Sequence, residues 1–586
     1  MALILPVLAA GCATPPVCTP VALDPETATE IAQAAPEPSS DVATRTDVSA
    51  AQHMIVAAHP LAAEAGLQML RLGGSAVDAA IAAELVLGLV EPQSSGLGGG
   101  AFMLLYDAAA DKSVAYDGRE TAPAGADETM FLDGNGVALE FDTAVESGRS
   151  VGVPGLVAML ELAHQDHGTL PWAALFGPAI KLASNGFPVS ERLHSLLVDY
   201  ADASWPNAAR AYFYPDGEPA SVGTLLVNPA YAATLRAIAD HGSEAFYDGT
   251  IAAAMIDAVA ADPMPGTLAA DDFARYQALR LQPVCSLYRD YRICGMGPPS
   301  SGGVTTLAIL GMIERFDMAN FSPNDPEAVH LIAEASRLAF ADRARYLADD
   351  RFVPVPTTGL IDPPYLAERS ALIDSECAMG EAAAGTPPGA IAMATPAPQR
   401  EPAGTTQISV VDDDGNAVSL TASIETAFGS RRFAAGFLLN NQLTDFAFVP
   451  TDDAGKTVAN RVEPGKRPRS SMAPTLVFAP DGDLHAVLGS PGGSRIIAYV
   501  TQALVGIIDW ELSPQEAIDL PHMSNRNGTT DLEAGTPIVA LAPDLAARGH
   551  EIRLVDMTSG LNAIVIDAGH LKGGSDPRRE GVALGD

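Results

Sequence analysis

Apolar and polar residues alternate along several short stretches of the chain, and elsewhere they recur with the period of a helix. Alternation from Ile408 to Ser423 predicts two strands joined by a tight turn at residues 413–416. The run MIVAAHP at 54–60 predicts another strand, and two apolar helices should follow it. Ser75, with Asp78 three residues later, should cap the second of these helices. Both helices are apolar enough to be buried.

The middle of the chain has the helical period. Between Gly155 and about Leu281, glycines 168, 186 and 242 each close a helical stretch. Further helices are expected over 305–316 and 325–346. The last third returns to closely spaced strands, then helices at 501–510 and 513–521, and a final pair of strands around 551–557 and 562–568. This order indicates an α+β or α/β fold.

One tract has no apolar period. Residues 380–404 are rich in Pro, Ala and Gly, and we expect them to be disordered up to the strand that begins at Thr405. Scission of the Gly404–Thr405 bond would give Thr405 a free α-amine with a pKa of about 7.7–8.0. That amine could act as the general base for the hydroxyl of Thr405. On these residues alone, an ordinary strand start is the more common explanation of the stretch.

Charge excludes one class of partner. The 586-residue chain has a net charge of −38, with 34 basic and 72 acidic residues, so nucleic acid would be repelled. Hydrophobic residues make up 48% of the chain, which predicts a large folded interior.

The N-terminal 49 residues resemble a signal and a disordered linker. A short apolar run ends in Ala9-Ala10-Gly11-Cys12, as in a bacterial lipoprotein signal, and the run is shorter than the roughly 20 residues that span a bilayer. No basic residue precedes the run, and Ala9 stands where such signals have Leu. We expect an exported, periplasmic protein, either lipid-anchored at Cys12 or exported without the lipid.

Two cysteines lie symmetrically about a predicted hairpin. Cys285 and Cys294 flank Arg289-Asp290, and opposed cysteines on a hairpin reach the separation that a disulfide needs. Export permits oxidation, so we predict this bridge, with two buried thiols as the alternative.

Three further motifs carry no cofactor or metal prediction. The glycines at 96–100 follow a helix and precede a strand, the reverse of a dinucleotide site, and we expect them to allow close backbone packing. His164 with His167 lacks an acid or cysteine to complete a ligand set, and His330 with Glu334 is interpreted in the same way. Both pairs are expected on the surface.

A series of segments in one order resembles the gamma-glutamyltransferase (gamma-glutamyltranspeptidase) family of N-terminal nucleophile hydrolases. The segments are EPQSSGLGGGAFMLLYD (91–107), DGRETAP (117–123), GVPG (152–155), PPSSGG (298–303), TTQISVVDDDGNAVS (405–419), LLNNQLTDF (438–446), KRPRSSMAPT (466–475), GSPGGSRI (489–496) and SDPRR (575–579). The resemblance implies a four-layer αββα sandwich of α+β class, built from a large subunit, 50–404, and a small subunit, 405–586.

The resemblance also implies the site. Thr405 would be the nucleophile, Ser423 its hydroxyl partner, and the backbone of Gly492 and Gly493 the oxyanion hole. The substrate-binding residues would be Arg119, Ser470 and Ser471 for an α-carboxylate, and Glu425, Gln442 and Asp445 for an α-ammonium group. As two residues apart on a strand point the same way, Glu425 is expected on the face of Ser423.

The implied activity is autoprocessed cleavage of γ-glutamyl amides such as glutathione, with transfer of the acyl group to water or to an amino acid or peptide and no cofactor. Two departures from the family are Gln407, where most members have His, and Glu425, where well-known transpeptidases have Asn. The alternatives are a cephalosporin (glutaryl) or other amide acylase on the same scaffold, and an unprocessed, inactive envelope binding protein. The stretch 446–464 gives no clear indication of a lid.

Overall fold

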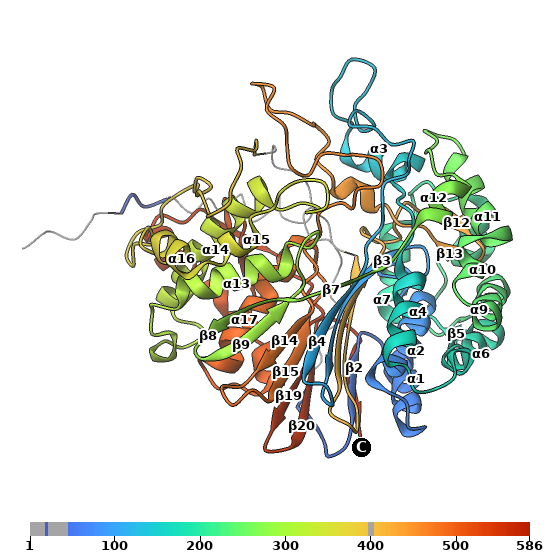
Figure 1. Cartoon of the computed structure of the whole chain (residues 1–586), viewed down its shortest axis with the longest axis horizontal. Coiled ribbons are helices and arrows are strands. Elements are labelled where there is room, and N and C mark those ends of the chain that lie inside the picture. The colour runs from blue at the N-terminus through green and yellow to red at the C-terminus, as the bar shows by residue number, and fades with distance from the viewer. Residues whose placement is uncertain (1–17, 22–44, 396–403) are drawn as a thin grey trace, which may run out of the picture.

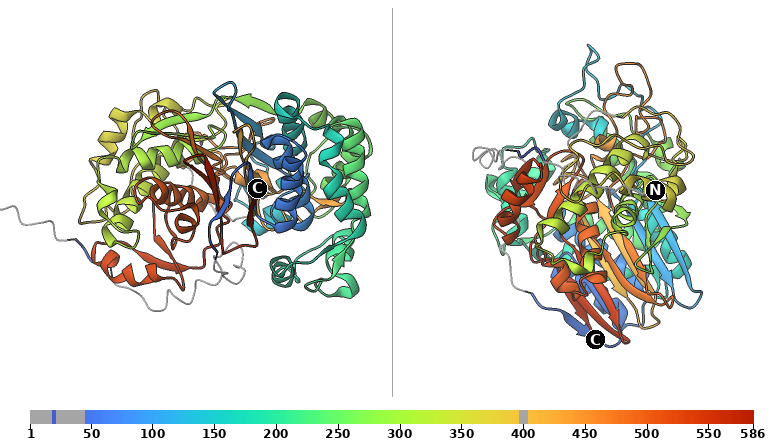
Figure 2. Two further views of the ribbon diagram at one scale, coloured as in Figure 1. Left: turned by 90° about the horizontal axis from the view of Figure 1, so that it is seen from below. Right: turned by 90° about the vertical axis from the view of Figure 1, so that its left-hand side faces the viewer.

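Two seven-stranded, mainly antiparallel sheets face each other, and helices cover the outer face of each sheet (Figure 1). The computed structural model describes residues 18–21, 45–395 and 404–586. From below, green-yellow and red-brown helices lie on one side of the strands, and blue and teal helices on the other (Figure 2). The α+β class and the αββα arrangement predicted above are confirmed.

The first sheet contains, in order, β1 (Val48–Ala50), β20 (His570–Ser575), β19 (Asn562–Asp567), β15 (Leu484–Gly489), β14 (Thr475–Phe478), β9 (Tyr291–Gly295) and β8 (Val284–Tyr288). The second contains β21 (Val582–Gly585), β2 (Met54–Ala57), β10 (Thr405–Val411), β11 (Ala417–Ser423), β3 (Gly100–Asp107), β4 (Lys112–Gly118) and β7 (Leu279–Leu281). Smaller sheets are β5 (Phe187–Pro188) with β6 (Leu225–Leu226), β12 (Phe433–Ala434) with β13 (Phe437–Leu438), and β16 (Met523–Asn525), β17 (Thr530–Glu533) and β18 (Ile552–Val555).

The helices that follow the first strands in sequence are α1 (Pro60–Arg71), α2 (Ala76–Val90), α3 (Phe141–Glu146), α4 (Leu156–His167), α5 (Trp172–Leu175), α6 (Gly177–Asn185), α7 (Glu191–Asp199), α8 (Asn207–Phe213), α9 (Pro229–His241), α10 (Glu244–Tyr247), α11 (Gly249–Ala260) and α12 (Ala270–Arg275). The later helices are α13 (Gly302–Ile313), α14 (Pro326–Tyr346), α15 (Thr357–Leu360), α16 (Pro363–Ser370), α17 (Ile496–Ile508), α18 (Pro514–Ile518) and α19 (Ala542–Ala547).

Strand alternation divides the interior into two cores. In β3, Met103 and Leu105 pack in the cluster that contains α1 and α2, whereas Phe102 and Leu104 pack in the cluster between the sheets. The period of two sends neighbouring side chains to opposite faces, so one strand serves both cores. The second cluster also includes the buried faces of α13, α14 and α17.

Two predictions that depend on residues close together in sequence, a helix cap and a hairpin, are confirmed. Ser75 and Asp78 form a capping box at the start of α2. The strands β10 and β11 pair from Thr405 with Ser423 to Val411 with Ala417, as the alternation predicts.

The predicted disulfide between Cys285 and Cys294 is present, and the two residues are directly opposed on β8 and β9. A second disulfide, Cys18–Cys377, was not predicted, and it attaches residues 18–21 to the folded body. The adjoining Val21 N–H donates to the carbonyl of Ala546 at 3.1 Å. These residues, and β1, therefore depart from the expectation of a disordered 1–49 segment, while Cys12 lies outside the described residues.

The tract before Thr405 is ordered over its first part, contrary to the prediction. The Gly385 N–H donates to Asp342 at 2.6 Å, and the Ala394 N–H donates to the Thr457 carbonyl at 3.0 Å. Met393 and Ala394 are buried. Hydrogen bonds to distant residues hold this irregular segment, and such bonds leave no periodic signal in the sequence.

The two strands expected around 551–557 and 562–568 are present: β18 joins β17 in a small sheet, and β19 pairs with β20. The surface expectation for His330 and Glu334 was wrong. His330 and Glu334 are fully buried, at 0% exposure, because α14 is covered on several sides rather than on one. His164 and His167 are half-buried.

The glycine-rich loop between α2 and β3 packs against the strand that ends at Ser423. A Cβ added to Gly99 would lie 2.2 Å from the Ser423 carbonyl oxygen, and Gly98 pairs with Leu439. The loop therefore serves close backbone approach, as expected, and no dinucleotide motif is present in it.

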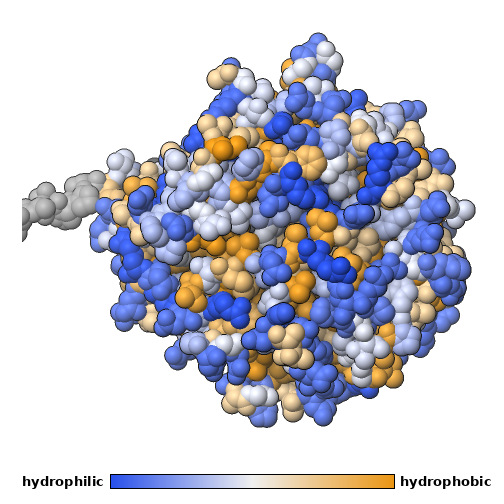
Figure 3. Space-filling view, in the orientation of Figure 1, coloured by the Kyte–Doolittle hydropathy of each residue, from blue (hydrophilic) through white to orange (hydrophobic). Residues whose placement is uncertain are grey.

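Figure 3 shows hydrophilic residues over most of one face of the molecule, with apolar residues between them in several separate patches. Within the described ranges, every helix is too short or too polar to cross a lipid bilayer.

Gly99→Ala should destabilise the protein by at least about 1–3 kcal/mol, because its methyl group would collide with backbone that cannot move aside cheaply. Gly134→Ala is the matched control, since nothing lies within 4 Å of a Cβ at Gly134. Thermal unfolding of both variants checks this, and equal melting temperatures would contradict it.

Candidate active site

A narrow pocket opens at the point where β10 begins and β11 ends. Its lining residues are Arg343, Thr405, Ser423, Glu425, Gln442, Asp445, Arg469, Ser470, Ser471, Met472, Gly493, Ser494 and Ile496. The structure thus brings together most of the residues that the sequence assigned to a site. They come from segments on both sides of residue 404.

Thr405 and Ser423 are cross-strand partners, which places their side chains on one face of the sheet. The Thr405 hydroxyl donates to Ser423 Oγ at 3.1 Å. The Ser423 hydroxyl in turn donates to the Gly404 carbonyl oxygen at 2.7 Å, and the Glu425 N–H donates to Ser423 Oγ at 2.9 Å. The hydroxyls of Thr405 and Ser423 therefore form a chain of hydrogen bonds that ends at the Gly404 carbonyl oxygen.

The peptide groups beside Thr405 are fixed from both sides. Ser423 holds the carbonyl of Gly404, and the Arg579 guanidinium donates to the carbonyl of Thr405 at 2.9 Å. Arg579 is buried and belongs to the SDPRR segment, but no role was predicted for it. It keeps the first peptide of β10 in place while Thr405 Oγ1 stays near the Gly404–Thr405 bond.

Gly492 and Gly493 have φ of 135° and 59°, in the region that favours glycine. Gly493 lines the pocket, and Gly492 lies behind it, where a Cβ would be 2.6 Å from the Tyr499 ring. The pair therefore brings bare backbone to the wall of the pocket that faces Thr405.

The three residues predicted to hold an ammonium group all line the pocket. Gln442 and Asp445 belong to the short turn Gln442–Asp445, and Gln442 Nε2 donates to Glu425 at 3.4 Å. The strand argument for Glu425 was wrong, because β11 ends at Ser423 and Glu425 has a positive φ of 83°. Glu425 reaches the pocket through this bend, not through strand alternation.

Arg119 is fully buried and is not among the residues that line the pocket. Its guanidinium forms a very short hydrogen bond to Asp445 and donates to the backbone carbonyls of Pro468 at 3.2 Å and Arg469 at 3.0 Å. In this structure Arg119 supports Asp445 and the segment that carries Ser470 and Ser471.

Two pocket arginines were missed by sequence reasoning. Arg343 of α14 donates to Ser471 Oγ at 2.6 Å and to Ser301 Oγ at 2.9 Å. Arg469 lies one residue before Ser470, within a segment that resembles the family. This position next to a predicted site residue could have identified Arg469 as a pocket residue. Arg343 had no comparable signal, since 128 residues separate it from Ser471.

Gln407 is buried between the sheets and does not line the pocket. It accepts a hydrogen bond from Thr421 at 2.6 Å and donates to Ser419 and to the Ile408 carbonyl, both at 3.0 Å. Both the oxygen and the nitrogen of its side-chain amide are hydrogen-bonded between the sheets. Gln407, which departs from the family, therefore stabilises β10 and does not contact the pocket.

The pocket combines a nucleophile with walls of opposite charge. Arg343 donates to Ser471 and Arg469 precedes Ser470, whereas Glu425 accepts a hydrogen bond from Gln442 and Asp445 belongs to the same short turn as Gln442. No histidine is among the lining residues in the described part of the chain, and an amine at Thr405 can act as the base for its own hydroxyl. Such a site suits acyl transfer from a molecule that carries both charges.

A Thr at the head of a central strand of an αββα sandwich defines the N-terminal nucleophile hydrolase class. Residues 62–586 match the model of the family described as Gamma-glutamyltranspeptidase, and the chain belongs to that family. It is 37% identical over 544 residues to a glutathione hydrolase proenzyme of Bacillus subtilis, with 91% of each chain covered. It is 36% identical to the acylase ACY 1 proenzyme of a Pseudomonas species over 92% of this chain and 94% of that one.

Among solved structures, the cephalosporin acylase from Bacillus halodurans is similar at a TM-score of 0.80 and 27% identity. The match covers 97% of this chain and 99% of the acylase.

Ser423→Ala should slow cleavage at the Gly404–Thr405 bond by about 10²–10³, the usual loss when one donor to a developing oxyanion is removed. Ser423→Thr keeps the hydroxyl and should retain most of the rate. A time course of the two product chains by mass spectrometry measures both. Equal rates in wild type and Ser423→Ala would contradict the assignment.

Proposed function

We propose that this protein is an autoprocessed gamma-glutamyltransferase and glutathione hydrolase, with a large subunit ending at Gly404 and a small subunit from Thr405 to Asp586. The observation that carries this is the pocket in which Thr405 meets Ser423, two acidic side chains and two arginines. The α-carboxylate and α-ammonium groups of a γ-glutamyl substrate match these walls. The close similarity to glutathione hydrolase proenzymes supports the same donor.

Processing begins with attack of Thr405 Oγ1 on the carbonyl carbon of Gly404. The C–N bond breaks as its nitrogen takes the proton lost by the hydroxyl, which frees the Thr405 amine and leaves Gly404 esterified to Oγ1. Water then hydrolyses this ester to the Gly404 carboxylate and the Thr405 hydroxyl. Ser423 polarises the carbonyl in this step through its 2.7 Å hydrogen bond.

In turnover, the Thr405 amine accepts the proton of its own hydroxyl, and Oγ1 attacks the γ-carbonyl of the substrate. The backbone of Gly492 and Gly493 stabilises the oxyanion, and the leaving amine takes the proton. Water or an acceptor amine then releases the γ-glutamyl group from Thr405.

In the binding of the substrate, Ser470 and Ser471 receive the α-carboxylate, with positive charge from Arg119 behind them and from Arg343 and Arg469 beside them. Glu425, Gln442 and Asp445 accept hydrogen bonds from the α-ammonium group. The Asp445–Arg119 ion pair fixes the residues for the α-ammonium group relative to those for the α-carboxylate.

The second candidate is a glutaryl or other amide acylase, which the similarity to acylases supports. A glutaryl group has no amine, so it could not donate the hydrogen bonds that the α-ammonium group of a γ-glutamyl substrate would give to the buried Glu425. This difference favours the γ-glutamyl donor.

We also infer export to the periplasm, either with a lipid anchor at Cys12 or without the lipid. The lipoprotein-like residues before Cys12 motivate this inference. The two disulfides support it, since disulfides persist in oxidising compartments.

The purified protein should consist of two chains that meet at Gly404 and Thr405, and Thr405→Ala should remain a single chain because it has no nucleophile. Intact mass spectrometry of both proteins measures this. A wild type that stays uncut and binds γ-glutamyl compounds without turnover would instead indicate the inactive binding protein.

γ-Glutamyl anilide should be cleaved at least about 100-fold better than glutaryl anilide, in kcat/KM, because the latter lacks the ammonium group that Glu425, Gln442 and Asp445 would bind. Glu425→Gln should narrow that ratio, chiefly by weakening the γ-glutamyl substrate. Comparable rates on both anilides in the wild type would favour the acylase. Processing of the variant is checked separately, so that a loss of turnover is not confused with a failure to mature.

A further inference from the structure

Three buried side chains of metal-binding type meet far from the active-site pocket. His330 and Glu334 lie one turn apart on α14, and His550 follows α19 in the second half of the chain. One ligand atom from each residue lies within 4.8 Å of the others, and His330, Glu334 and His550 are each 0% exposed. None of the three has a part in the proposed reaction.

The orientation of the His330 ring is fixed by a partner outside the cluster. Its Nε2–H donates to the carbonyl of Asp374 at 2.8 Å, and a carbonyl can only accept. In the neutral ring, the lone pair of Nδ1 therefore points to His550 Nε2, which is 2.8 Å away. A backbone carbonyl that orients a histidine in this way is the usual support of a metal ligand.

His550 also has a hydrogen-bond partner on the ring nitrogen that faces away from the cluster. Its Nδ1 lies 3.0 Å from the hydroxyl of Thr530, which also accepts a hydrogen bond from Asn525 at 2.9 Å. Neutral imidazoles are the form that binds metal ions.

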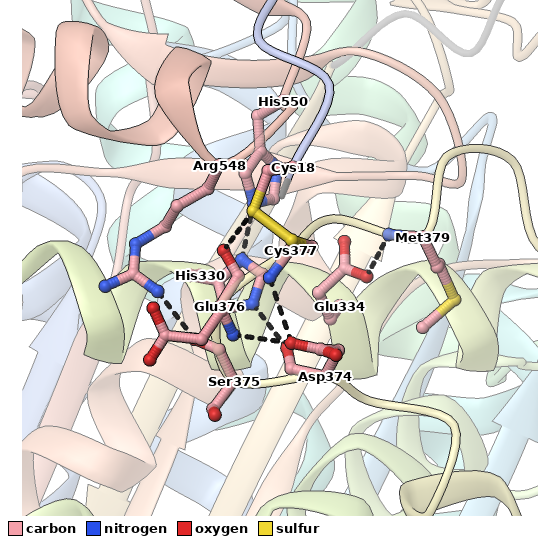
Figure 4. The surroundings of a disulfide bond; sticks show 10 residues. All are labelled: Cys18, His330, Glu334, Asp374, Ser375, Glu376, Cys377, Met379, Arg548 and His550. Atoms are coloured by element: carbon pink, nitrogen blue, oxygen red, sulfur yellow. Dashed lines mark hydrogen bonds between the residues drawn. A yellow bond between two sulfur atoms is a disulfide. The ribbon is translucent and has the colours of Figure 1, made fainter. Parts of the chain in front are cut away.

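Glu334 is held by two donors that leave it coordination capacity. The Met379 N–H donates to one carboxylate oxygen at 2.8 Å, and Arg337 Nε donates to the other at 3.0 Å. Each oxygen keeps a further lone pair. The positive charges of Arg337 and Arg548 oppose a dication, but Glu334, Asp374 and Glu376 supply three negative charges in the same neighbourhood (Figure 4).

We propose that His330 Nδ1, His550 Nε2 and one oxygen of Glu334 bind a divalent transition-metal ion of the Zn²⁺ type. Two imidazoles and one carboxylate are an established zinc ligand set, with one position left for water. For this, the proton of His550 moves from Nε2 to Nδ1, and the ring stays neutral. The new Nδ1–H then donates a hydrogen bond to the oxygen of the Thr530 hydroxyl. The two nitrogens must separate to about 3.3 Å, the spacing of two ligands around tetrahedral zinc.

The ion would join the two halves of the chain. His330 and Glu334 precede residue 404 and His550 follows it, so after cleavage the metal would cross-link the two subunits. The Cys18–Cys377 disulfide lies beside the histidines and attaches residues 18–21 at the same place (Figure 4). The role of the ion is thus structural.

The test uses the processed protein, stripped with a chelator, dialysed, and then equilibrated with Zn²⁺ or Co²⁺. We expect about one equivalent of bound zinc by elemental analysis, and Co²⁺ absorption in the visible range with the intensity of a four-coordinate site. Zinc should also raise the Tm, because it binds the folded state. Less than about 0.1 equivalent in the wild type would overturn the proposal and leave a histidine–histidine hydrogen bond.

His330→Ala and His550→Ala should each lose the bound zinc at least about tenfold, whereas His570→Ala, an exposed histidine at the start of β20, should keep it. If an alanine variant does not fold, His550→Gln retains a side chain of similar size and a polar group toward Thr530, and far-ultraviolet circular dichroism reports its folding. Zinc content unchanged in folded His330 and His550 variants would place the ion elsewhere and contradict the site.

Discussion

The register between β10 and β11 is the constraint on which the site depends. It sets Thr405 opposite Ser423, and from this pair follow the hydrogen bond to the Gly404 carbonyl and the position of the nucleophile in the pocket. A shift of one residue would turn Thr405 toward the helices and bring Thr406 to its place. The neighbouring strands β2 and β3 prevent that shift, since each is paired with β10 or β11 over several residues.

The pocket is charged before any substrate arrives, and its charges are balanced. Asp445 is paired with Arg119 in a nearly dry setting, and that pair also ties down the backbone of Pro468 and Arg469. Removing one partner of a buried pair is costlier than removing both, because the remaining charge is left without compensation. Changes at Arg119 or Asp445 therefore act on the shape of the pocket as well as on substrate recognition.

Short-range patterns predicted the β10–β11 hairpin, the Ser75 cap and the Cys285–Cys294 bridge, because each depends on residues close together in sequence. Thr405, Ser423, Gln442 and Ser470, which the family resemblance assigned to a site, line one pocket. Contacts of long range escaped: Arg343 with Ser471, Arg579 with Thr405, and His330 with His550. The surface assignment of His330 failed for this reason, since its burial depends on elements more than 200 residues away, as the separation of 220 residues from His550 shows.

Sheet order has a further consequence for the mature enzyme. Strands β10 and β11 lie between β2 and β3, so each side of the cut contributes interior strands to the same sheet. The uncut chain can form this arrangement with Thr405 tethered beside its target. Once separated, two denatured fragments would have to associate again, and the β10–β11 hairpin would have to insert between β2 and β3. The mature heterodimer is therefore preserved by the slowness of its unfolding, and its lifetime, more than its equilibrium stability, sets how long it functions.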